Sequence, residues 1–304
     1  MSKFYCLCMS PAIDATVTLK AAPCGNGEIF KDVADVENVG GKTINVARWL
    51  ALRGAETACG GLLGEANAVL FGKELAKFGV QDRFVRVPGS TRRNEMIVWP
   101  DGSFKMNRAA FAGVPADFFA DISRFLPDGD LSGTVAILAG SLPKNCPMSF
   151  YAGAICSLKA KGAFVVFDAS GEALKLGLGA QPDVIKPNAD ECEALVGFVP
   201  KTPDEFRRAT ELLKAKVGCP IISDGGSGCW FDGAFVAAPK VDVADATAAG
   251  DTLLAEWCWR RLGLGRENIE AARWAVAAGS AACLMPGGDP PAPEQVKKLW
   301  EEVK

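Results

Sequence analysis

The chain has 304 residues and no histidine, with 33 lysine and arginine residues against 36 aspartate and glutamate residues. The lack of histidine excludes Ser-His-Asp and Cys-His nucleophilic sites and histidine-ligated zinc, so a carboxylate, Lys, Tyr or Cys must carry any proton transfer. A net charge of −3 without a long basic cluster argues against nucleic acid or an anionic membrane and favours a small-molecule partner.

The cysteines and the apolar runs indicate the compartment. The eleven cysteines are an odd number without a Cys-x-x-Cys pattern, and several lie inside apolar runs, as in a reduced protein core. The Cys6-x-Cys8 pair therefore favours core packing over a metal site. No apolar run approaches the ~18 residues of a membrane span, and no secretion leader is evident. We expect a soluble cytoplasmic protein.

Apolar runs of strand length alternate with segments of helical periodicity along most of the chain. The predicted strands cover residues 4–9, 57–63, 134–139, 164–168 and 183–186, and the predicted helices cover 43–53, 67–78, 148–161, 204–216, 249–262, 268–284 and 292–303. This order predicts one α/β domain over residues 1–304, with a mainly parallel sheet between two layers of helices. Ligands of such sheets bind at the carboxyl ends of the strands.

Two insertions, at about 12–36 and 82–108, read as strands without intervening helices. The strands are predicted at 12–19, 28–36, 84–87, 95–99 and 103–107, and Pro100-Asp101-Gly102-Ser103 is a hairpin signal. We expect them to form one small antiparallel sheet that acts as a lid. Such a sheet needs a second surface to cover its apolar face, and a homodimer made lid to lid would supply it.

The segment 245–251, Asp-Ala-Thr-Ala-Ala-Gly-Asp, directly precedes an apolar helix. Small side chains at Ala248, Ala249 and Gly250 leave consecutive backbone amides bare at a helix N-terminus, which is an anion-binding arrangement. Asp251 in the first turn would place a carboxylate beside the anion, where it could act as base for an attacking hydroxyl. Alternatively, Asp251 only complements the helix dipole.

A second polar segment, 183–191, runs from a buried strand into a predicted helix. Asn188 and Glu191 are three residues apart, so one helical face would carry an amide and a carboxylate able to hold the water shell of Mg²⁺. Lys186, at the carboxyl end of the strand, is placed to meet a phosphate. The Asn-x-x-Glu pattern is also a common start of a helix.

A glycine-rich turn follows the apolar run Ile221-Ile222, with Ser223, Gly225 and Gly228 among its residues. Such a turn lets the backbone approach a nucleotide closely, or it only marks a hairpin. Neither a Gly-x-Gly-x-x-Gly motif after the first strand nor a Walker A loop is present. The sequence therefore does not favour a dinucleotide-binding dehydrogenase.

Near the N-terminus, Gly40, Gly41 and Lys42 open a predicted helix, with Asn45 one turn inside it. Asp14 follows the first predicted strand. Asp and Asn side chains beside exposed backbone amides suit the recognition of vicinal sugar hydroxyls, because a wrong ligand leaves these groups unpaired.

Together these segments resemble the PfkB family of carbohydrate kinases, in the ribokinase-like superfamily, over nearly the whole chain. The matching motifs occur in the family's order: Asn/Ser-Pro-x-x-Asp at 10–14, Gly-Gly-Lys-x-x-Asn-Val-Ala at 40–47, Thr-Arg-x-Asn at 91–94, Gly-Ser-Leu-Pro at 140–143, Lys-Pro-Asn-x-x-Glu at 186–191 and Ala-Gly-Asp at 249–251. Within the family, the best match is the branch of 1-phosphofructokinase and tagatose-6-phosphate kinase.

The resemblance implies a role for each motif. Asp251 is the expected base, and the amides of Ala248, Ala249 and Gly250 form the expected anion hole for the transferred phosphoryl group. The nucleotide side comprises Lys186, Ser223, Gly225 and Gly228, with Asn188 and Glu191 ordering Mg²⁺ through water. The sugar side comprises Asp14, Gly40, Gly41, Lys42, Asn45 and Arg92, with Ser141 near the groove between the substrates. The implied activity is ATP-dependent phosphorylation of a phosphorylated ketohexose, with ATP and Mg²⁺ as cofactors.

The chain departs from the family pattern at two positions. Ala248 stands where the family usually has Gly, and Thr43 where this branch commonly has Gly. A left-handed backbone at position 248 would cost Ala about 1 kcal/mol and could tilt the anion hole. The segment 27–30 also lacks the basic residues that some relatives place near a sugar phosphate. The cations that could replace them are Lys42, Arg92, Arg93 and Arg108.

Two other functions stay open on the sequence. The protein could be a kinase of an unphosphorylated sugar or a nucleoside, in which case an aromatic pocket would replace the lid arginines. It could also be a sugar- or nucleotide-binding regulator that has lost catalysis through the altered anion hole.

Overall fold

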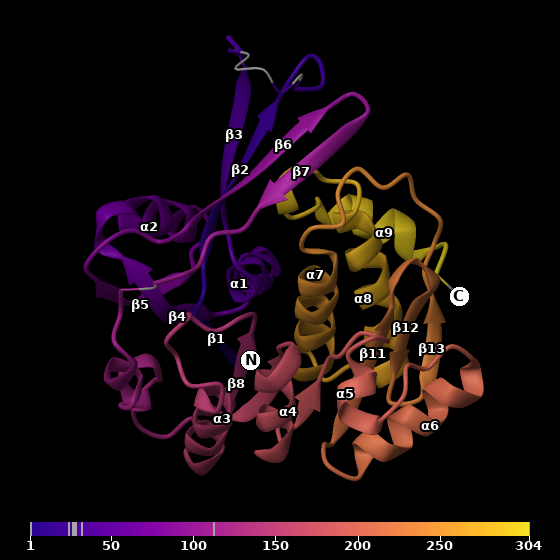
Figure 1. The fold of residues 1–304 in the computed structure, drawn as a ribbon. Helices are drawn as coiled ribbons and strands as arrows, with labels where there is room; N and C mark the ends of the chain where they lie inside the picture. The colour runs from indigo at the N-terminus through magenta and orange to yellow at the C-terminus, as the bar shows by residue number, and fades with distance from the viewer. Residues whose placement is uncertain (1, 24, 26–28, 32, 112, 304) are drawn as a thin grey trace.

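A nine-stranded sheet runs through the body of the protein in the computed structural model, which describes residues 2–23, 25, 29–31, 33–111 and 113–303 (Figure 1). From edge to edge its strands are β13 (Ala234–Ala237), β12 (Gly228–Phe231), β11 (Cys219–Asp224), β10 (Val184–Ile185), β9 (Phe164–Asp168), β8 (Thr134–Ala139), β1 (Lys3–Cys8), β4 (Thr57–Gly64) and β5 (Gln81–Val87). The strands from β11 to β5 pair in parallel, and β12 and β13 pair antiparallel. The predicted mainly parallel sheet is confirmed.

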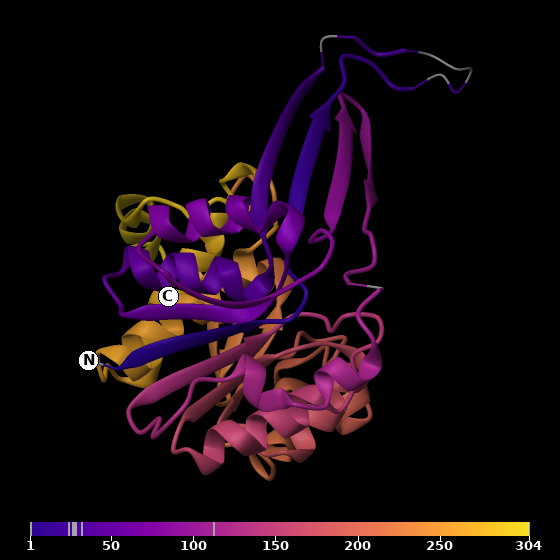
Figure 2. The same cartoon turned by 90° about the vertical axis from the view of Figure 1, so that its left-hand side faces the viewer.

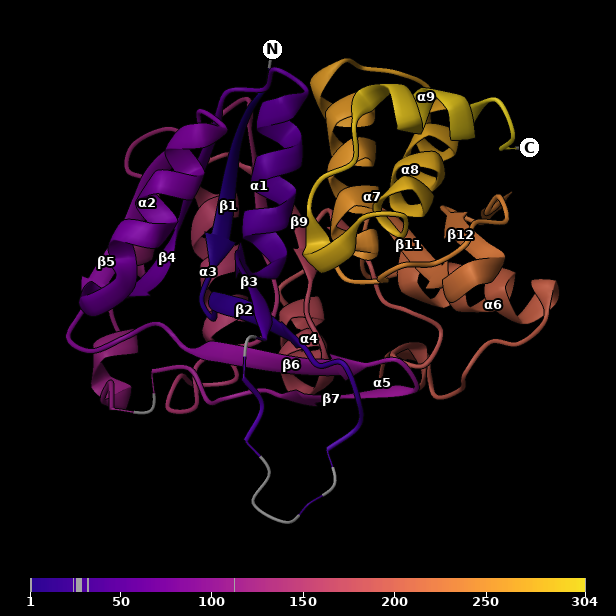
Figure 3. The ribbon, with the colours of Figure 1, turned by 90° about the horizontal axis from the view of Figure 1, so that it is seen from above.

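Helices cover both faces of this sheet, so the body has the three layers expected of a ribokinase-like fold (Figure 2). One layer comprises α1 (Lys42–Leu52), α2 (Ala68–Lys77), α7 (Ala249–Trp257), α8 (Asn268–Ala282) and α9 (Pro293–Trp300). The other comprises α3 (Phe150–Ala160), α4 (Gly171–Gly179), α5 (Cys192–Val196) and α6 (Pro203–Lys214). Seen from above, α1 and α7 lie next to each other (Figure 3), and they pack together.

The central strand β1 shows why these apolar runs form buried strands. Its alternate residues Phe4, Cys6 and Cys8 enter the core beneath one helical layer, whereas Tyr5 and Leu7 enter the core on the other side. A strand that is covered on both faces needs apolar side chains at every position rather than at every second one. The prediction that Cys6 and Cys8 fill the core is therefore confirmed.

A separate four-stranded sheet, called the lid below, projects from the body (Figure 2). Its strands, in spatial order, are β3 (Ala34–Gly40), β2 (Ala12–Thr18), β6 (Arg93–Trp99) and β7 (Gly102–Met106). The predicted hairpin is present, because Pro100 and Asp101 join β6 to β7. The two outer pairings are antiparallel, while the central pairing of β2 with β6 is parallel, since these strands come from different insertions.

Two details of the lid differ from the prediction. The strand at 84–87 was assigned to the lid, but β5 pairs in parallel with β4 at the edge of the main sheet, so that assignment was wrong. A strand was expected at 28–36, where residues 28 and 32 lie outside the described part, and the observed β3 begins only at Ala34 and continues to Gly40. Strand periodicity does not specify the partner of a strand, because pairing depends on distant residues.

The helices end close to their predicted bounds, with one exception. The predicted helix 249–262 ends as an α-helix at Trp257 and continues as a π-helical turn over Cys258–Gly263. Short 3-10 turns cover Glu65–Asn67, Ala116–Phe119, Ile122–Phe125, Gly225–Ser227 and Pro286–Gly288. In the described part of the chain, every helix is too short or too polar to cross a lipid bilayer.

Candidate active site

A cleft of about 490 Å³ lies between the lid and the body and collects residues from distant parts of the chain. Among its lining residues are the predicted Asp14, Gly41, Lys42, Asn45, Arg92, Ser141, Ala248, Gly250 and Asp251. Lining residues that were not predicted include Asn94, Lys105, Asn107 and Thr247. Asn94 belongs to the Thr-Arg-x-Asn motif, so its place in that motif was an available signal.

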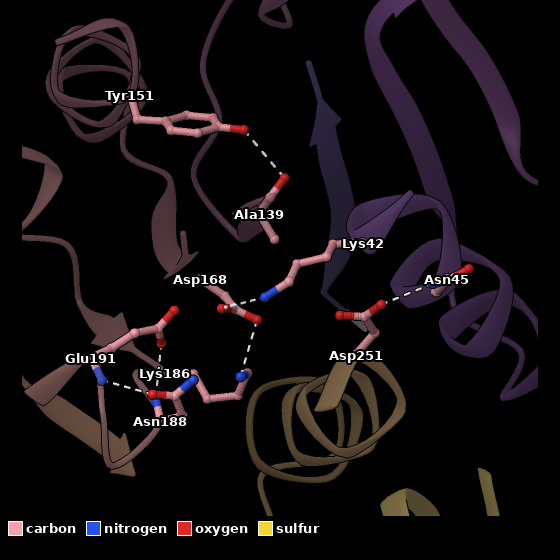
Figure 4. A network of polar contacts seen from close by, with 9 residues as sticks. All are labelled: Lys42, Asn45, Ala139, Tyr151, Asp168, Lys186, Asn188, Glu191 and Asp251. Atoms are coloured by element: carbon pink, nitrogen blue, oxygen red, sulfur yellow. Dashed lines mark hydrogen bonds and ion pairs between the residues drawn. The ribbon is translucent and has the colours of Figure 1, made fainter. Parts of the chain in front are cut away.

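Asp251 lies buried in the first turn of α7, at the base of this cleft. The Nδ2 group of Asn45 donates a hydrogen bond of 2.8 Å to its Oδ2 atom (Figure 4). Burial raises the pKa of the carboxyl to about 6; Lys42, Asn45 and Lys186 oppose that rise, and the charge of Asp168 adds to it. The carboxylate is therefore a stronger base than an exposed aspartate.

Asp168 organises the cations around Asp251, and the sequence interpretation missed it. It is buried at the carboxyl end of β9, and its two oxygens lie 2.9 Å from Nζ of Lys42 and 3.1 Å from Nζ of Lys186 (Figure 4). Burial raises the pKa of Asp168, but the two lysines outweigh it and hold the pKa below the usual value. An acidic residue that ends an apolar parallel strand was the available signal.

The backbone at Ala248 is left-handed, with φ 63° and ψ 1°, and this residue caps the N-terminus of α7. The amide of Ala249 donates to the carbonyl of Ala246 at 3.3 Å. The amides of Gly250 and Asp251 donate to no acceptor in the part of the chain that the structure describes. A β-carbon on Gly250 would lie 3.6 Å from Nζ of Lys186, so the ammonium group of Lys186 lies next to the free amides.

Asn188 and Glu191 lie in a turn before α5 rather than on a helical face, so that part of the prediction was wrong. Each side chain accepts a hydrogen bond from the other residue's amide: Asn188 Oδ1 at 2.7 Å and Glu191 Oε2 at 2.9 Å. This reciprocal pairing fixes both side chains at the surface (Figure 4). It engages one oxygen of Glu191 and leaves Oε1 without a donor among the described residues.

The glycine-rich segment forms a hairpin, which was one of the two interpretations of the sequence. β11 and β12 pair antiparallel around the turn Gly225–Ser227, and Gly225 has φ 49°. At Gly228, φ is 140° and a β-carbon would lie 2.2 Å from the carbonyl oxygen of Val236, so only glycine fits there. Ser223 pairs with the backbone beside Asn188, which joins the two predicted nucleotide segments.

The paired glycines before α1 make room for two neighbouring groups. A β-carbon on Gly40 would lie 2.3 Å from Oδ2 of Asp14, and one on Gly41 would lie 2.9 Å from Sγ of Cys8. Asp14 lies on β2 and accepts a hydrogen bond from Asn94 at 2.8 Å. Thr43, one of the two expected departures from the family pattern, is fully buried and does not line the cleft.

Most of the cations expected to meet a phosphate have other partners. Arg92 donates to the carbonyl oxygens of Ser10, Pro11 and Arg108. Arg93 forms ion pairs with Glu37 and Glu95, and Arg108 pairs with Glu95. Lys105 lines the cleft from β7, and its side chain has no ion pair or hydrogen bond within the described part of the chain.

The chain is similar in sequence to known carbohydrate kinases. Residues 11–295 match the family described as pfkB family carbohydrate kinase. The chain is 31% identical to 1-phosphofructokinase of Vibrio cholerae, with 99% of this chain and 96% of that protein covered. It is 34% identical to 1-phosphofructokinase of Rhodobacter capsulatus, with 97% and 95% covered.

The solved structures give the same result for the fold. Phosphofructokinase-2 from Escherichia coli in complex with potassium aligns with a TM-score of 0.86 at 25% identity, over 99% of each chain. Its tetrameric inhibited form aligns with a TM-score of 0.85 at the same identity and coverage. Since the family match spans nearly the whole chain and the relatives cover it end to end, the protein belongs to the pfkB family of carbohydrate kinases.

Proposed function

We propose that this carbohydrate kinase transfers a phosphoryl group from ATP to a hydroxyl of a phosphorylated ketohexose, as a 1-phosphofructokinase does. One observation carries the proposal: the buried carboxylate of Asp251, beside free amides at the start of α7, faces a cleft that it shares with Asp14, Asn45 and Lys105. The similarity to two 1-phosphofructokinases supports this substrate class over other sugars.

Asp251 is the proposed base. Asn45 engages Oδ2, whereas no donor in the described part of the chain contacts Oδ1, so Oδ1 is available to the accepting hydroxyl. With a pKa of about 6, the carboxyl is ionised at neutral pH and can take the proton as the new bond forms. Phosphoryl transfer has a loose transition state, so positioning and charge stabilisation contribute more than base strength.

The amides of Gly250 and Asp251 are the proposed anion hole for the transferred phosphoryl group. Lys186 lies beside Gly250 and is held by Asp168, so its position is fixed before substrates bind. Donors that are already oriented toward developing charge need no reorganisation during the reaction. The left-handed backbone of Ala248, at the residue that caps α7, would turn these amides toward the cleft.

The nucleotide and Mg²⁺ side is assigned to the residues around Asn188. Mg²⁺ keeps most of its waters in proteins and needs few protein ligands, so the surface carboxylate of Glu191, with Oε1 free, and the amide of Asn188 fit a water-mediated site. When bound there, Mg²⁺ would neutralise negative charge on the nucleotide phosphates. Lys186, Ser223, Gly225 and Gly228 are the further proposed contacts of ATP.

The lid supplies the proposed contact with the phosphate of the sugar. Residues that are paired in a sheet share a face, so Lys105, opposite Met96, lies on the same side as Asn94 and Asp14. Because Arg92 already donates to three carbonyl groups, Lys105 is the better candidate for the phosphate. Asp14, Gly40, Gly41 and Asn45 would bind the sugar hydroxyls.

The lid also supports a proposal about assembly. Exposed apolar side chains lie at Phe104 and Met106 of β7, on the face opposite Lys105, and a second lid would cover them in a homodimer. The cysteines that the structure describes are all free thiols, which fits a reducing cytoplasm. We infer that the whole chain acts as one catalytic domain carrying this lid.

A coupled assay of ADP release tests the function. The substrates are fructose 1-phosphate, tagatose 6-phosphate, fructose 6-phosphate, fructose and ribose, each with ATP and Mg²⁺. We expect the highest kcat/KM on fructose 1-phosphate. A preference for fructose or ribose would support a kinase of unphosphorylated sugars. ATP binding without turnover on any of the five would support a regulator that has lost catalysis.

A further inference from the structure

The two helices that carry the polar groups of the cleft are joined at two successive levels. At the upper level, Asn45 of α1 donates to Asp251 of α7 at 2.8 Å. One turn further along α1, the indole Nε1 of Trp49 donates to Oε2 of Glu256 at 2.8 Å. Residues four apart lie on one face of a helix, so the same face of α1 makes both contacts with α7.

Glu256 is a fully buried carboxylate with several donors. Besides Trp49, it pairs with Arg53, the C-cap residue of α1, whose Nη2 lies 3.2 Å from Oε1 and whose Nε lies 3.2 Å from Oε2. Arg260, one turn along its own helix, donates to Oε1 at 2.9 Å. A buried carboxylate that accepts three hydrogen bonds and pairs with two arginines is held in one geometry.

We propose that Glu256 is a positioning residue that locks α1 against α7 and thereby holds the amide of Asn45 on the carboxylate of Asp251. No part of Glu256 reaches the cleft, so it acts through Asn45 rather than on a substrate. Its effect on turnover rests on the proposed function, whereas its effect on the geometry of Asp251 does not.

The rigidity of a helix makes the coupling direct. Asn45 and Trp49 are separated by about 6 Å along α1, because each residue rises about 1.5 Å. A slide or rotation of α1 that follows the loss of the Glu256 contacts therefore moves Asn45 by a similar amount. A hydrogen bond of 2.8 Å does not survive a displacement of that kind.

The charges around Asp251 determine in which direction its pKa should change when Glu256 is substituted. The groups that face this carboxyl are Lys42 and Asn45 from α1, Asp168 from β9 and Lys186 after β10. Removing the negative charge of Glu256 would, by charge alone, favour ionisation of Asp251 and lower its pKa. Losing the hydrogen bond from Asn45 would raise the pKa. The two effects have opposite directions.

The first experiment is a carbon-13 NMR titration of the Asp251 carboxyl in the ligand-free protein, with the signal identified by its loss in Asp251→Asn. We expect Glu256→Gln and Trp49→Phe each to raise the pKa of Asp251 by at least ~0.5. Trp49→Phe removes one donor to Glu256 without changing a charge, and it tests the proposal if Glu256→Gln does not fold. An unchanged or lowered pKa in both variants would overturn it.

Trp257→Phe is the matched control. It removes a buried indole of α7 that donates to Asn268 at 3.0 Å, away from α1, and we expect no change in the pKa of Asp251. A rise as large as that in Trp49→Phe would show a general loosening of α7 and contradict the proposal. This titration needs no turnover, so an inactive wild-type protein would refute the proposed function while the role of Glu256 was still measured.

The second experiment is a double-mutant cycle in the kinase assay. We expect Glu256→Gln to lower kcat/KM for the sugar about fivefold, since the displaced Asn45 serves both Asp251 and the proposed sugar site. If Glu256 acts through Asn45, Asn45→Ala combined with Glu256→Gln should be no slower than Asn45→Ala alone. Additive losses would show that Glu256 does not act through Asn45.

Discussion

Nζ of Lys42, at the start of α1, lies 2.9 Å from Oδ1 of Asp168, at the end of β9, so one buried carboxylate anchors a cation from the opposite side of the cleft. Asp168 holds Lys186 in the same way at 3.1 Å. The pair brings two positive charges to the base of the cleft without pairing either of them to Asp251. The balance between these charges determines how Asp251 titrates.

Asp168→Asn should therefore change both stability and the pH profile. Loss of the shared counter-charge leaves Lys186 buried without its partner, and we expect the free energy of unfolding at pH 7 to fall by about 3 kcal/mol. The charge of Asp168 raises the pKa of Asp251, so the acidic limb of kcat/KM should move to lower pH. Urea unfolding and a pH series measure the two effects. A limb that moved to higher pH would contradict this account of Asp251.

The wild-type pH profile gives a second prediction. Asp251 accepts a proton only when it is ionised, and burial raises its pKa to about 6. We expect kcat/KM to fall as the pH decreases through 6, with a slope of one proton. Asp251→Asn should abolish transfer and leave the affinity for ATP within a few fold. Retention of ~10% of the wild-type kcat in that variant would refute the role as base.

The same buried carboxylate should destabilise the protein at neutral pH. Its folded-state pKa is raised to about 6, compared with ~3.9 in the unfolded chain, so its stabilising contribution is full below pH ~3.9 and is lost as the pH rises to 6. In Asp251→Asn the side chain does not titrate, so the variant lacks this pH-dependent loss of stability. We expect the free energy of unfolding of the variant, relative to wild type, to increase by roughly 3 kcal/mol from pH 4 to pH 8. Asp168→Asn should show the opposite trend, mainly below pH ~4, because the pKa of Asp168 is lowered.

Ala248→Gly tests the departure from the family pattern. The φ of 63° costs Ala about 1 kcal/mol, so Gly should raise the free energy of unfolding by up to that amount. We expect kcat to stay within about threefold, since the amides of Gly250 and Asp251 keep their direction. Ala249→Gly is the control, because position 249 is helical and glycine there should destabilise. A large gain in kcat for Ala248→Gly would show that Ala248 tilts the anion hole.

Lys105→Met tests the contact with the sugar phosphate. Lys105 lines the cleft without another partner in the described residues, so its loss should raise the KM for a sugar phosphate about tenfold and leave that for fructose nearly unchanged. Arg92→Ala removes a guanidinium that donates to the carbonyl groups of Ser10, Pro11 and Arg108. We expect this variant to lower the free energy of unfolding in addition to any change in KM. Equal changes of KM for fructose and its phosphate would exclude Lys105 as the phosphate contact.

The motifs showed which residues to consider, and their order along the chain indicated the family. Asp14 from β2 of the lid, Lys42 and Asn45 from α1, and Asp251 from α7 come together in the cleft. The possible left-handed conformation of Ala248 was also raised from the sequence, and the structure has it. The local sequence was enough to identify these residues because each motif consists of neighbouring residues that form one turn.

The sequence by itself determined the alternation of strands and helices over much of the chain, the absence of histidine chemistry and the set of polar motifs, since these depend on residues close together in the chain. Only the tertiary structure decided that β5 joins the main sheet, that Asp168 holds two lysines and that Arg92 is engaged by backbone carbonyls. Strand partners, burial and counter-charges depend on residues that are distant in sequence. The same physical reason explains why Glu256 becomes visible only when α1 and α7 are packed together.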